Sequence, residues 1–191
     1  RNCRNWPRAA ISRPLPIALM AKVFLDTCVL FPPLLRNLLL GLADAGLYDP
    51  VWSEGVEAEW LHLNCRKGET PVEPSIARMR ARWPEGLAPP GDADWLDLPD
   101  PADRHVLAAA IAAGVPTLLT LNLRDFPRRS LAPHGIMAQS PDDFVMALWL
   151  ASPGIVEDGV AATWPGLDGK ALRKALKKAD LPRLGRALEQ G

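Results

Sequence analysis

One carboxylate in this sequence lies inside an otherwise apolar run. The segment FLDTCVLFP, residues 24–32, contains Asp26 as its only charged residue. Burying an unpaired charge costs several kcal/mol unless the charge finds a partner or coordinates a metal. No lysine or arginine stands beside Asp26 to neutralise it. We therefore expect Asp26 to be a metal ligand, provided that further acids reach the same place.

A second candidate acid, Glu59, lies in the apolar stripe of a predicted helix. This helix is expected to begin after Ser53, its N-cap, and to run to about Cys65. Glu59 shares the i, i+3, i+4, i+7 spacing of the apolar residues that face inward. Glu54 and Glu57 lie off that stripe, so we expect their side chains to be in solvent. Taken alone, Glu59 could instead pair with an arginine.

Two more candidate acids, Asp103 and Asp125, lie in the second half of the chain. Asp103 comes three residues after Asp100, the predicted N-cap of an alanine-rich helix, and is aligned with Leu107 on the inward side. Asp125 follows a predicted strand in the segment TLNLRDF, which also holds Asn122. Each acid has a simpler explanation when taken alone. Asp103 could serve the helix dipole, an effect of about 0.3–1 kcal/mol, and Asp125 could cap a turn.

Taken together, the four acids indicate metal chemistry. Open parallel sheets bind ligands outside the carboxyl ends of their strands, and Asp26 and Asp125 both follow predicted strands. Four carboxylates at one sheet edge would repel each other without cations. A set of oxygen ligands alone favours Mg²⁺, with Mn²⁺ as the alternative, over zinc. Such sets are typical of two-metal phosphodiester cleavage, with ions about 3.5–4 Å apart.

The elements that must position these acids alternate between strand and helix. This alternation predicts an α/β fold in which helices flank a central parallel sheet. The predicted strands span residues 22–26, 47–52, 116–122 and 135–139. The predicted helices span residues 32–45, 53–65, 75–83, 100–114 and 140–150, and a loop rich in proline and glycine follows residue 83.

Two helical segments have surfaces that need an explanation. Residues 32–45 are more apolar than one core-facing stripe requires, so we expect cover on two sides, and a partner chain is one candidate for the second. Near the C-terminus five basic residues share one helical face. They could contact RNA phosphates, or they could be the solvated side of an amphipathic helix, which we favour. The five are Lys170, Arg173, Lys174, Lys177 and Lys178.

The bulk composition is that of a globular protein without an overall charge. The chain has 191 residues, 48% of them hydrophobic and 23% charged, with a formal net charge of zero. These values argue against disorder and against attraction of the whole chain to nucleic acid or membrane. The three cysteines lack paired spacing, which favours a reducing, cytoplasmic location. No apolar run reaches the about 18 residues of a membrane span, and we expect no signal peptide.

We divide the chain into three parts. Residues 1–19 are an N-terminal extension, either upstream sequence or an artefact, because Met20 precedes the first strand by two residues. Residues 20–150 are expected to form the main domain, and residues 151–191 a helical C-terminal extension.

Four segments resemble the PIN-domain (PilT N-terminus) nucleases, in particular the VapC-like toxins of toxin–antitoxin pairs. They keep the order and spacing of that family over most of residues 22–150. The most specific is the last part of the third, TLNLRDFP after an alanine-rich helix. The segments are VFLDTCVL, LYDPVWSEGVEAEW, LPDPADRHVLAAAIAAGVPTLLTLNLRDFP and GIMAQSPDDFV.

This resemblance implies a PIN-like three-layer α/β/α fold and a cytoplasmic, Mg²⁺-dependent endoribonuclease. The family's four catalytic, metal-binding acids correspond to Asp26, Glu59, Asp103 and Asp125, and its polar position beside the last acid to Asn122. Asp100 is a secondary candidate, as an outer-sphere substitute for one of these acids. The resemblance also implies an RNA substrate, a homodimer and inhibition by a cognate antitoxin, for which the apolar helix 32–45 offers a contact surface.

Other interpretations are weaker. An aspartate-nucleophile phosphatase of the haloacid dehalogenase type needs a second acid two residues after the first, and that position is Cys28. His105 could assist proton transfer, although a structural role is favoured, and His62 and His134 are interpreted as incidental. The sequence lacks the P-loop, zinc-protease and serine-hydrolase motifs. The alternative that stays open is a PIN-like module that binds RNA or protein without cleaving it.

Overall fold

A computed structural model describes residues 21–67 and 71–190 of the chain. The predictions about residues 1–19 and Met20 lie outside the described residues. Within them, five strands form one sheet in the order β3-β2-β1-β4-β5, and every neighbouring pair is parallel. The strands are β1 (Lys22–Leu25), β2 (Asp49–Ser53), β3 (Leu87–Ala88), β4 (Thr117–Leu119) and β5 (Met137–Gln139).

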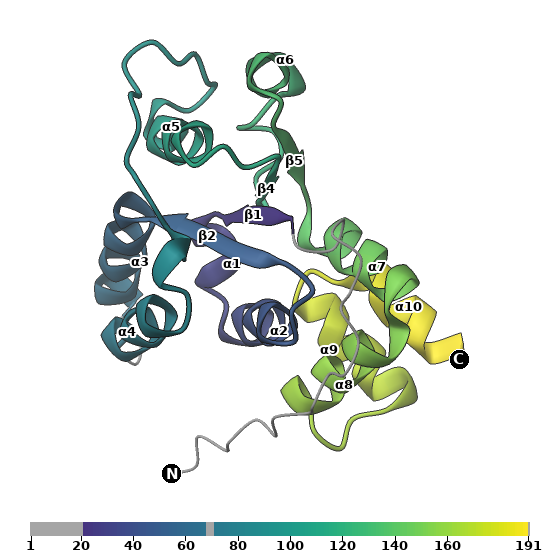
Figure 1. The fold of residues 1–191 in the computed structure, drawn as a ribbon. Helices are drawn as coiled ribbons and strands as arrows, with labels where there is room; N and C mark the ends of the chain where they lie inside the picture. Colours follow the sequence, from purple (N-terminus) through teal and green to yellow (C-terminus); the bar gives the residue numbers. More distant parts are fainter. Residues whose placement is uncertain (1–20, 68–70, 191) are drawn as a thin grey trace.

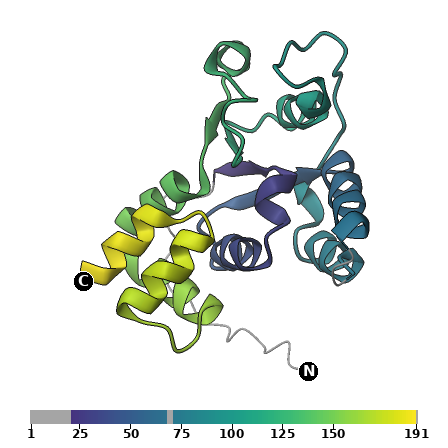
Figure 2. The same ribbon diagram turned by 180° about the vertical axis from the view of Figure 1, so that it is seen from behind.

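Helices cover both faces of this sheet, which confirms the predicted three-layer α/β/α fold. Figure 1 shows α2 on one face and α5 on the other, and Figure 2 shows the same layers from behind. The helices are α1 (Thr27–Leu30), α2 (Pro33–Asp44), α3 (Glu54–Lys67), α4 (Glu73–Arg82), α5 (Arg104–Ala112), α6 (Arg128–Leu131), α7 (Pro141–Ala151), α8 (Pro153–Thr163), α9 (Gly169–Lys178) and α10 (Pro182–Gln190). Short 3₁₀ turns span Pro84–Gly86, Pro101–Asp103 and Ala132–His134. No helix in the described ranges is both long and apolar enough to cross a bilayer.

The N-caps expected from the sequence at Ser53 and Asp100 are present in the structure. Ser53 Oγ accepts a hydrogen bond from the backbone N–H of Val56, and Asp100 Oδ1 accepts one from Ala102. These bonds satisfy amides that have no partner inside the helix. Gly114 follows α5 with φ of 63°, a left-handed conformation that glycine adopts without strain. The start and end of the alanine-rich helix are therefore local properties of its sequence.

The structure adds one strand that the sequence prediction missed. Leu87 and Ala88 lie within the segment predicted as a loop, yet they pair with Trp52 and Ser53 of β2. A strand of two residues has no periodicity to detect, so tertiary pairing alone defines it.

The second apolar side of α2 is covered by the chain itself. Leu38 and Leu42 are fully buried, and a Cβ added at Gly159 of α8 would lie 3.0 Å from Leu42 Cδ2 and 3.4 Å from Leu38 Cδ1. Of the large apolar residues of this helix, Leu34 remains exposed, at 45%. Helix α8 therefore provides the cover for which a partner chain was one candidate, while Leu34 is exposed and Leu40 is half-buried on the rest of α2.

The prediction that Glu57 lies in solvent was wrong. Glu57 is 6% exposed, and Oε1 accepts hydrogen bonds from Trp52 Nε1 at 2.8 Å and from Arg80 Nε at 2.9 Å. A buried carboxylate is tolerated when a charged partner and further donors satisfy it. The arginine comes from α4, 23 residues further along the chain, so the sequence pattern of α3 could not reveal this pairing.

The C-terminal helices form a compact group beside α7 and α2. Asp142 of α7 is 6% exposed and accepts hydrogen bonds from the backbone N–H groups of Arg183 and Leu184 at the start of α10. The basic residues predicted on α9 are exposed and Leu176 is buried, which confirms an amphipathic helix packed on the protein. One of them, Arg173, pairs with Glu189 of α10 at 2.6 Å.

Candidate active site

The candidate acids gather where the order of the strands reverses. The chain runs from β1 to β2 to β3 on one side and then crosses to β4 and β5 on the other. The carboxyl ends of β1 and β4 therefore flank a topological switch point, which is where open α/β sheets bind ligands. Asp26 directly follows β1, and the segment that carries Asp125 follows β4.

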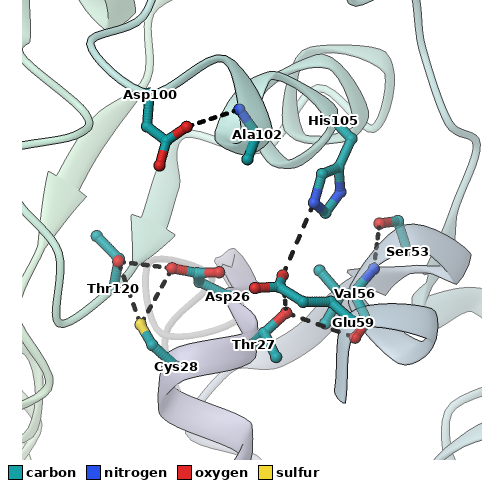
Figure 3. A network of polar contacts seen from close by, with 10 residues as sticks. All are labelled: Asp26, Thr27, Cys28, Ser53, Val56, Glu59, Asp100, Ala102, His105 and Thr120. Carbon is teal, nitrogen blue, oxygen red and sulfur yellow. Dashed lines mark hydrogen bonds and ion pairs between the residues drawn. The ribbon is translucent and has the colours of Figure 1, made fainter. Parts of the chain in front are cut away.

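Asp26 is held by hydrogen bonds from two other elements. It is 4% exposed, and its Oδ2 accepts bonds from Thr120 Oγ1 at 2.7 Å and from Cys28 Sγ at 3.0 Å. Its backbone N–H donates to the carbonyl of Leu119 at 3.1 Å, which extends the pairing of β1 with β4. Both side-chain donors bind Oδ2, so Oδ1 is left as the oxygen available to a cation. Figure 3 shows this carboxylate at the centre of the polar network.

Glu59 reaches the same place from α3. Thr27 Oγ1 donates a hydrogen bond of 2.7 Å to Glu59 Oε2, so the residue after Asp26 orients the second acid. Figure 3 shows the Glu59 carboxylate joined by dashed lines to Thr27, the residue after Asp26, and to His105. The predicted inward direction of Glu59 agrees with this placement, although 42% of its side chain is exposed.

Asp103 is close enough to the other acids for them to alter its titration. Partial burial and the charges of four carboxylates, from Asp26, Asp100, Asp125 and Glu59 in that order, raise the pKa of Asp103 to about 7. Negative neighbours favour the neutral form of a carboxyl group, and so does removal from water. The structure therefore brings all four predicted acids, together with Asp100, into one electrostatic cluster.

The segment after β4 forms a turn that presents Asp125. The backbone N–H of Asn122 donates to Thr120 Oγ1 at 3.0 Å, and the backbone N–H of Asp125 donates to the carbonyl of Asn122 at 3.0 Å. Asn122 is exposed and Asp125 is half-buried. Thr120 thus links this turn to Asp26, because the same hydroxyl that accepts from Asn122 donates to the carboxylate.

His105 has a partner that the sequence did not reveal. Its Nε2 lies 3.7 Å from Glu59 Oε2, while its Nδ1 is buried without a hydrogen-bond partner in the described part of the chain. A Cβ at Gly55 would lie 2.6 Å from that Nδ1, so glycine is what lets the imidazole approach α3. His105 therefore packs over the second acid at the site, whereas His62 is exposed on α3.

The donor set suits a hard divalent cation. Oxygen atoms from several carboxylates are what Mg²⁺ prefers, and their mutual repulsion is relieved by positive charge. As placed, no three His, Cys, Asp or Glu side chains among residues 21–67 and 71–190 form a set that could hold a metal ion. The residue types and their shared location fit the cation, and the arrangement shown is not yet a coordination shell.

Sequence reasoning missed the residues that support the acids. Thr27, Thr120 and Cys28 each donate a hydrogen bond to a candidate acid. The Cys28 thiol contacts Asp26, and burial raises the pKa of this thiol far above its ordinary value. A polar residue directly after a strand-end acid was the available signal for Thr27.

The basic residues of α9 lie away from this cluster. Figures 1 and 2, which view the molecule from opposite sides, both place α9 among the C-terminal helices, at the other end of the molecule from α3 and α5. RNA contact by Lys170, Lys174, Lys177 or Lys178 stays a prediction, and it would need a substrate that extends across the protein.

Comparison with known proteins gives one local similarity. A stretch of 44 residues is 48% identical to a protein of Mycobacterium tuberculosis (strain ATCC 25618 / H37Rv) named "Putative ribonuclease VapC50". It covers 23% of this chain and 26% of that protein. No family model and no solved structure matches the chain. The match supports a VapC-like, PIN-like relationship, and it extends over about a quarter of either sequence.

Proposed function

We propose that this protein is a metal-dependent endoribonuclease that cleaves RNA phosphodiester bonds. The observation that carries the proposal is the gathering of Asp26 and Glu59 at the carboxyl end of the sheet with Asp100, Asp103 and Asp125 nearby; partial burial and these charges together raise the pKa of Asp103. Such a cluster is unfavourable without a cation, and perturbed carboxyl groups of this kind concentrate at functional sites. The named relative is described as a ribonuclease, which supports RNA as the substrate.

Asp26, Glu59, Asp103 and Asp125 would hold the metal, with Mg²⁺ as the first candidate and Mn²⁺ as the second. Bound there, the cation would polarise the scissile phosphate and lower the pKa of an attacking water. The protein's own contribution is orientation. Thr120 and Cys28 fix Asp26, and Thr27 fixes Glu59, through hydrogen bonds to one carboxylate oxygen of each acid. Until a cation neutralises it, the cluster repels RNA, so RNA binding should itself depend on divalent ions.

The biological setting follows from the same relationship. We propose a toxin of a toxin–antitoxin pair that acts in the cytoplasm as a homodimer and is inhibited by a cognate antitoxin protein. The VapC-like local match and the family resemblance of the motifs support this setting.

The test is cleavage of a labelled pool of structured RNA by the purified protein and by its Asp26→Asn variant, each with Mg²⁺, Mn²⁺ or EDTA. Cleavage that needs the cation and is lost in the folded variant would support the proposal. A folded wild-type protein that neither cuts RNA nor binds Mn²⁺ would overturn it.

The second candidate is a PIN-like module that binds RNA or protein without cleavage. The same experiment separates the two, because the binding module would retain RNA or protein binding in EDTA and would show no metal-dependent cutting.

A further inference from the structure

A pocket lies beside the acid cluster and is built by the same chain segments. Its volume is about 310 Å³, at the lower end of the range of about 300–1,000 Å³ typical of ligand pockets. Its walls include Trp95, Asp97, Leu107, Arg129 and His134. Nothing in the proposed metal chemistry uses these residues.

Three segments contribute both a candidate acid and a pocket residue. Asp97 precedes Asp100 by three residues, Leu107 follows Asp103 by one helical turn, and Arg129 follows Asp125 by four residues. One turn of helix rises about 5.4 Å, so the Leu107 wall of the pocket lies about one turn along α5 from Asp103. Figures 1 and 2 both show the loop before α5 lying next to α6, the two elements that enclose the pocket.

Trp95 is presented to solvent by a loop that is held on α5. Its side chain is 57% exposed, while its neighbour Leu96 is buried at 4%. Gly91 anchors the same loop, since a Cβ there would lie 2.2 Å from the carbonyl oxygen of Ala108 in α5, and its φ is 71°. Ser130 Oγ donates to the carbonyl of Asp97 at 3.0 Å and ties the loop to α6. A large aromatic ring on an anchored loop is a preformed contact surface, which reduces the entropy cost of binding.

The chemistry of the pocket suits a base rather than a phosphate. The Trp95 and His134 rings meet edge to face with centroids 5.2 Å apart, so the indole keeps a face for another ring. Asp97 and Arg129 give the wall one negative and one positive side chain, which is a poor site for a doubly charged group but a good one for a polar, uncharged ring. Unpaired bases are bound in this way, by stacking on aromatic side chains and by hydrogen bonds to their edges.

The surroundings provide the matching contacts for the RNA backbone. Arg124, Arg128 and Arg129 are exposed on the segment that carries Asp125. None of them forms an ion pair among residues 21–67 and 71–190. Free guanidinium groups beside an aromatic surface are typical of single-strand binding, where cations follow the backbone and rings receive the bases.

We propose that this pocket is the subsite for an unpaired nucleobase next to the cleaved bond, with Trp95 as the stacking surface. The inference rests on the proposed ribonuclease function, and it requires that the base bound in the pocket be unpaired. An antitoxin side chain in the same pocket is the competing occupant.

The test measures binding separately from cleavage. A fluorescein-labelled single-stranded oligouridylate is titrated with protein by fluorescence anisotropy, with Ca²⁺ replacing Mg²⁺ and the RNA checked for integrity on a gel. The variants are Trp95→Ala and Trp95→Phe. The matched control is Trp149→Ala, because Trp149 lines a separate pocket of about 360 Å³ among the C-terminal helices. Circular dichroism verifies that each variant is folded.

We expect Trp95→Ala to weaken RNA binding about tenfold, a loss of about 1.4 kcal/mol, because the base loses its stacking contact with the indole ring. Trp95→Phe should retain most of the affinity, and Trp149→Ala should bind like the wild type. Equal affinity of wild type and Trp95→Ala for RNA would overturn the subsite proposal. The ribonuclease proposal would still hold in that case if metal-dependent cleavage persists. A wild-type protein that neither binds nor cuts RNA would overturn both proposals. Loss of a protein partner by Trp95→Ala, with RNA binding unchanged, would assign the pocket to the antitoxin instead.

Discussion

At the scale of single residues, the site is defined by how each acid is supported. Asp26 is buried and receives two hydrogen bonds on one oxygen, whereas Glu59 is partly exposed and receives one from Thr27. Asp103 differs from both, because partial burial and like charges raise its pKa to about 7. Three carboxylates in one cluster thus have three environments, which differ in burial and in the hydrogen bonds that each carboxylate accepts.

The raised pKa of Asp103 predicts a pH-dependent stability. A carboxyl group whose pKa is higher in the folded state than the ordinary 3.8 stabilises the fold below about pH 4, and that contribution is lost as the pH rises through about 7. In EDTA, wild type should therefore lose stability relative to Asp103→Asn as the pH increases from about 4 to about 8. The measurement is urea denaturation of both proteins at several pH values. Addition of Mg²⁺ at the higher pH should narrow the difference, and a difference that does not change with pH would contradict the prediction.

At the scale of elements, the apolar helix α2 explains why α8 needs a glycine. Gly159 lies against Leu42 and Leu38, so the two helices approach more closely than a side chain would allow. Close helix contacts commonly depend on such small residues, because a larger one forces the backbones apart. The core of the main domain and the C-terminal helices therefore meet at a tightly packed surface.

Replacing Gly159 with leucine should destabilise the protein by about 1–3 kcal/mol through overpacking. The matched control is Gly154→Leu in the same helix, where an added Cβ meets nothing within 4 Å. The control should change the free energy of unfolding by no more than about 0.5 kcal/mol, as surface substitutions usually do. Chemical denaturation of the two variants beside wild type gives both values. Similar losses in both would show that the α2–α8 contact tolerates a side chain.

At the scale of the whole molecule, the C-terminal helices are attached by a buried polar contact as well as by apolar packing. Asp142 of α7 accepts hydrogen bonds from two backbone N–H groups at the start of α10, at 2.8 and 3.1 Å. Both donors belong to the unpaired first turn of that helix, where a negative charge is also favoured by the helix dipole. The Asp142 side chain therefore pairs with two otherwise unpaired N–H groups of a helix that begins about forty residues further along the chain.

Asp142→Ala should loosen α9 and α10 more than it disturbs the sheet. Hydrogen bonds to a charged group contribute about 1.5–3 kcal/mol, so the loss of two should be visible as local opening. Hydrogen exchange followed by mass spectrometry should show faster exchange in residues 169–190 and little change in β1 and β4. Asp158→Ala, an exposed acid on α8, is the control and should leave both regions unchanged. Uniformly faster exchange over the sheet in Asp142→Ala would show that the chain unfolds as one unit.

The sequence by itself determined the features that depend on neighbours along the chain. The caps at Ser53 and Asp100, the glycine stop after α5 and the placement of Asp26 at a strand end are all local, because hydrogen bonding and strand polarity act within a few residues. The α/β class followed from the alternation of such elements. The roles assigned to the four acids are still untested predictions.

Only the tertiary structure decided which distant side chains meet. The burial of Glu57 against Arg80, the support of Asp26 by Thr120 and the cover of α2 by α8 each join residues separated by more than twenty positions. The pocket beside Trp95 likewise needs three segments brought together by the strand order. Periodicity reports which face of an element is apolar, but the partner on that face is set by the topology of the sheet and by long-range packing.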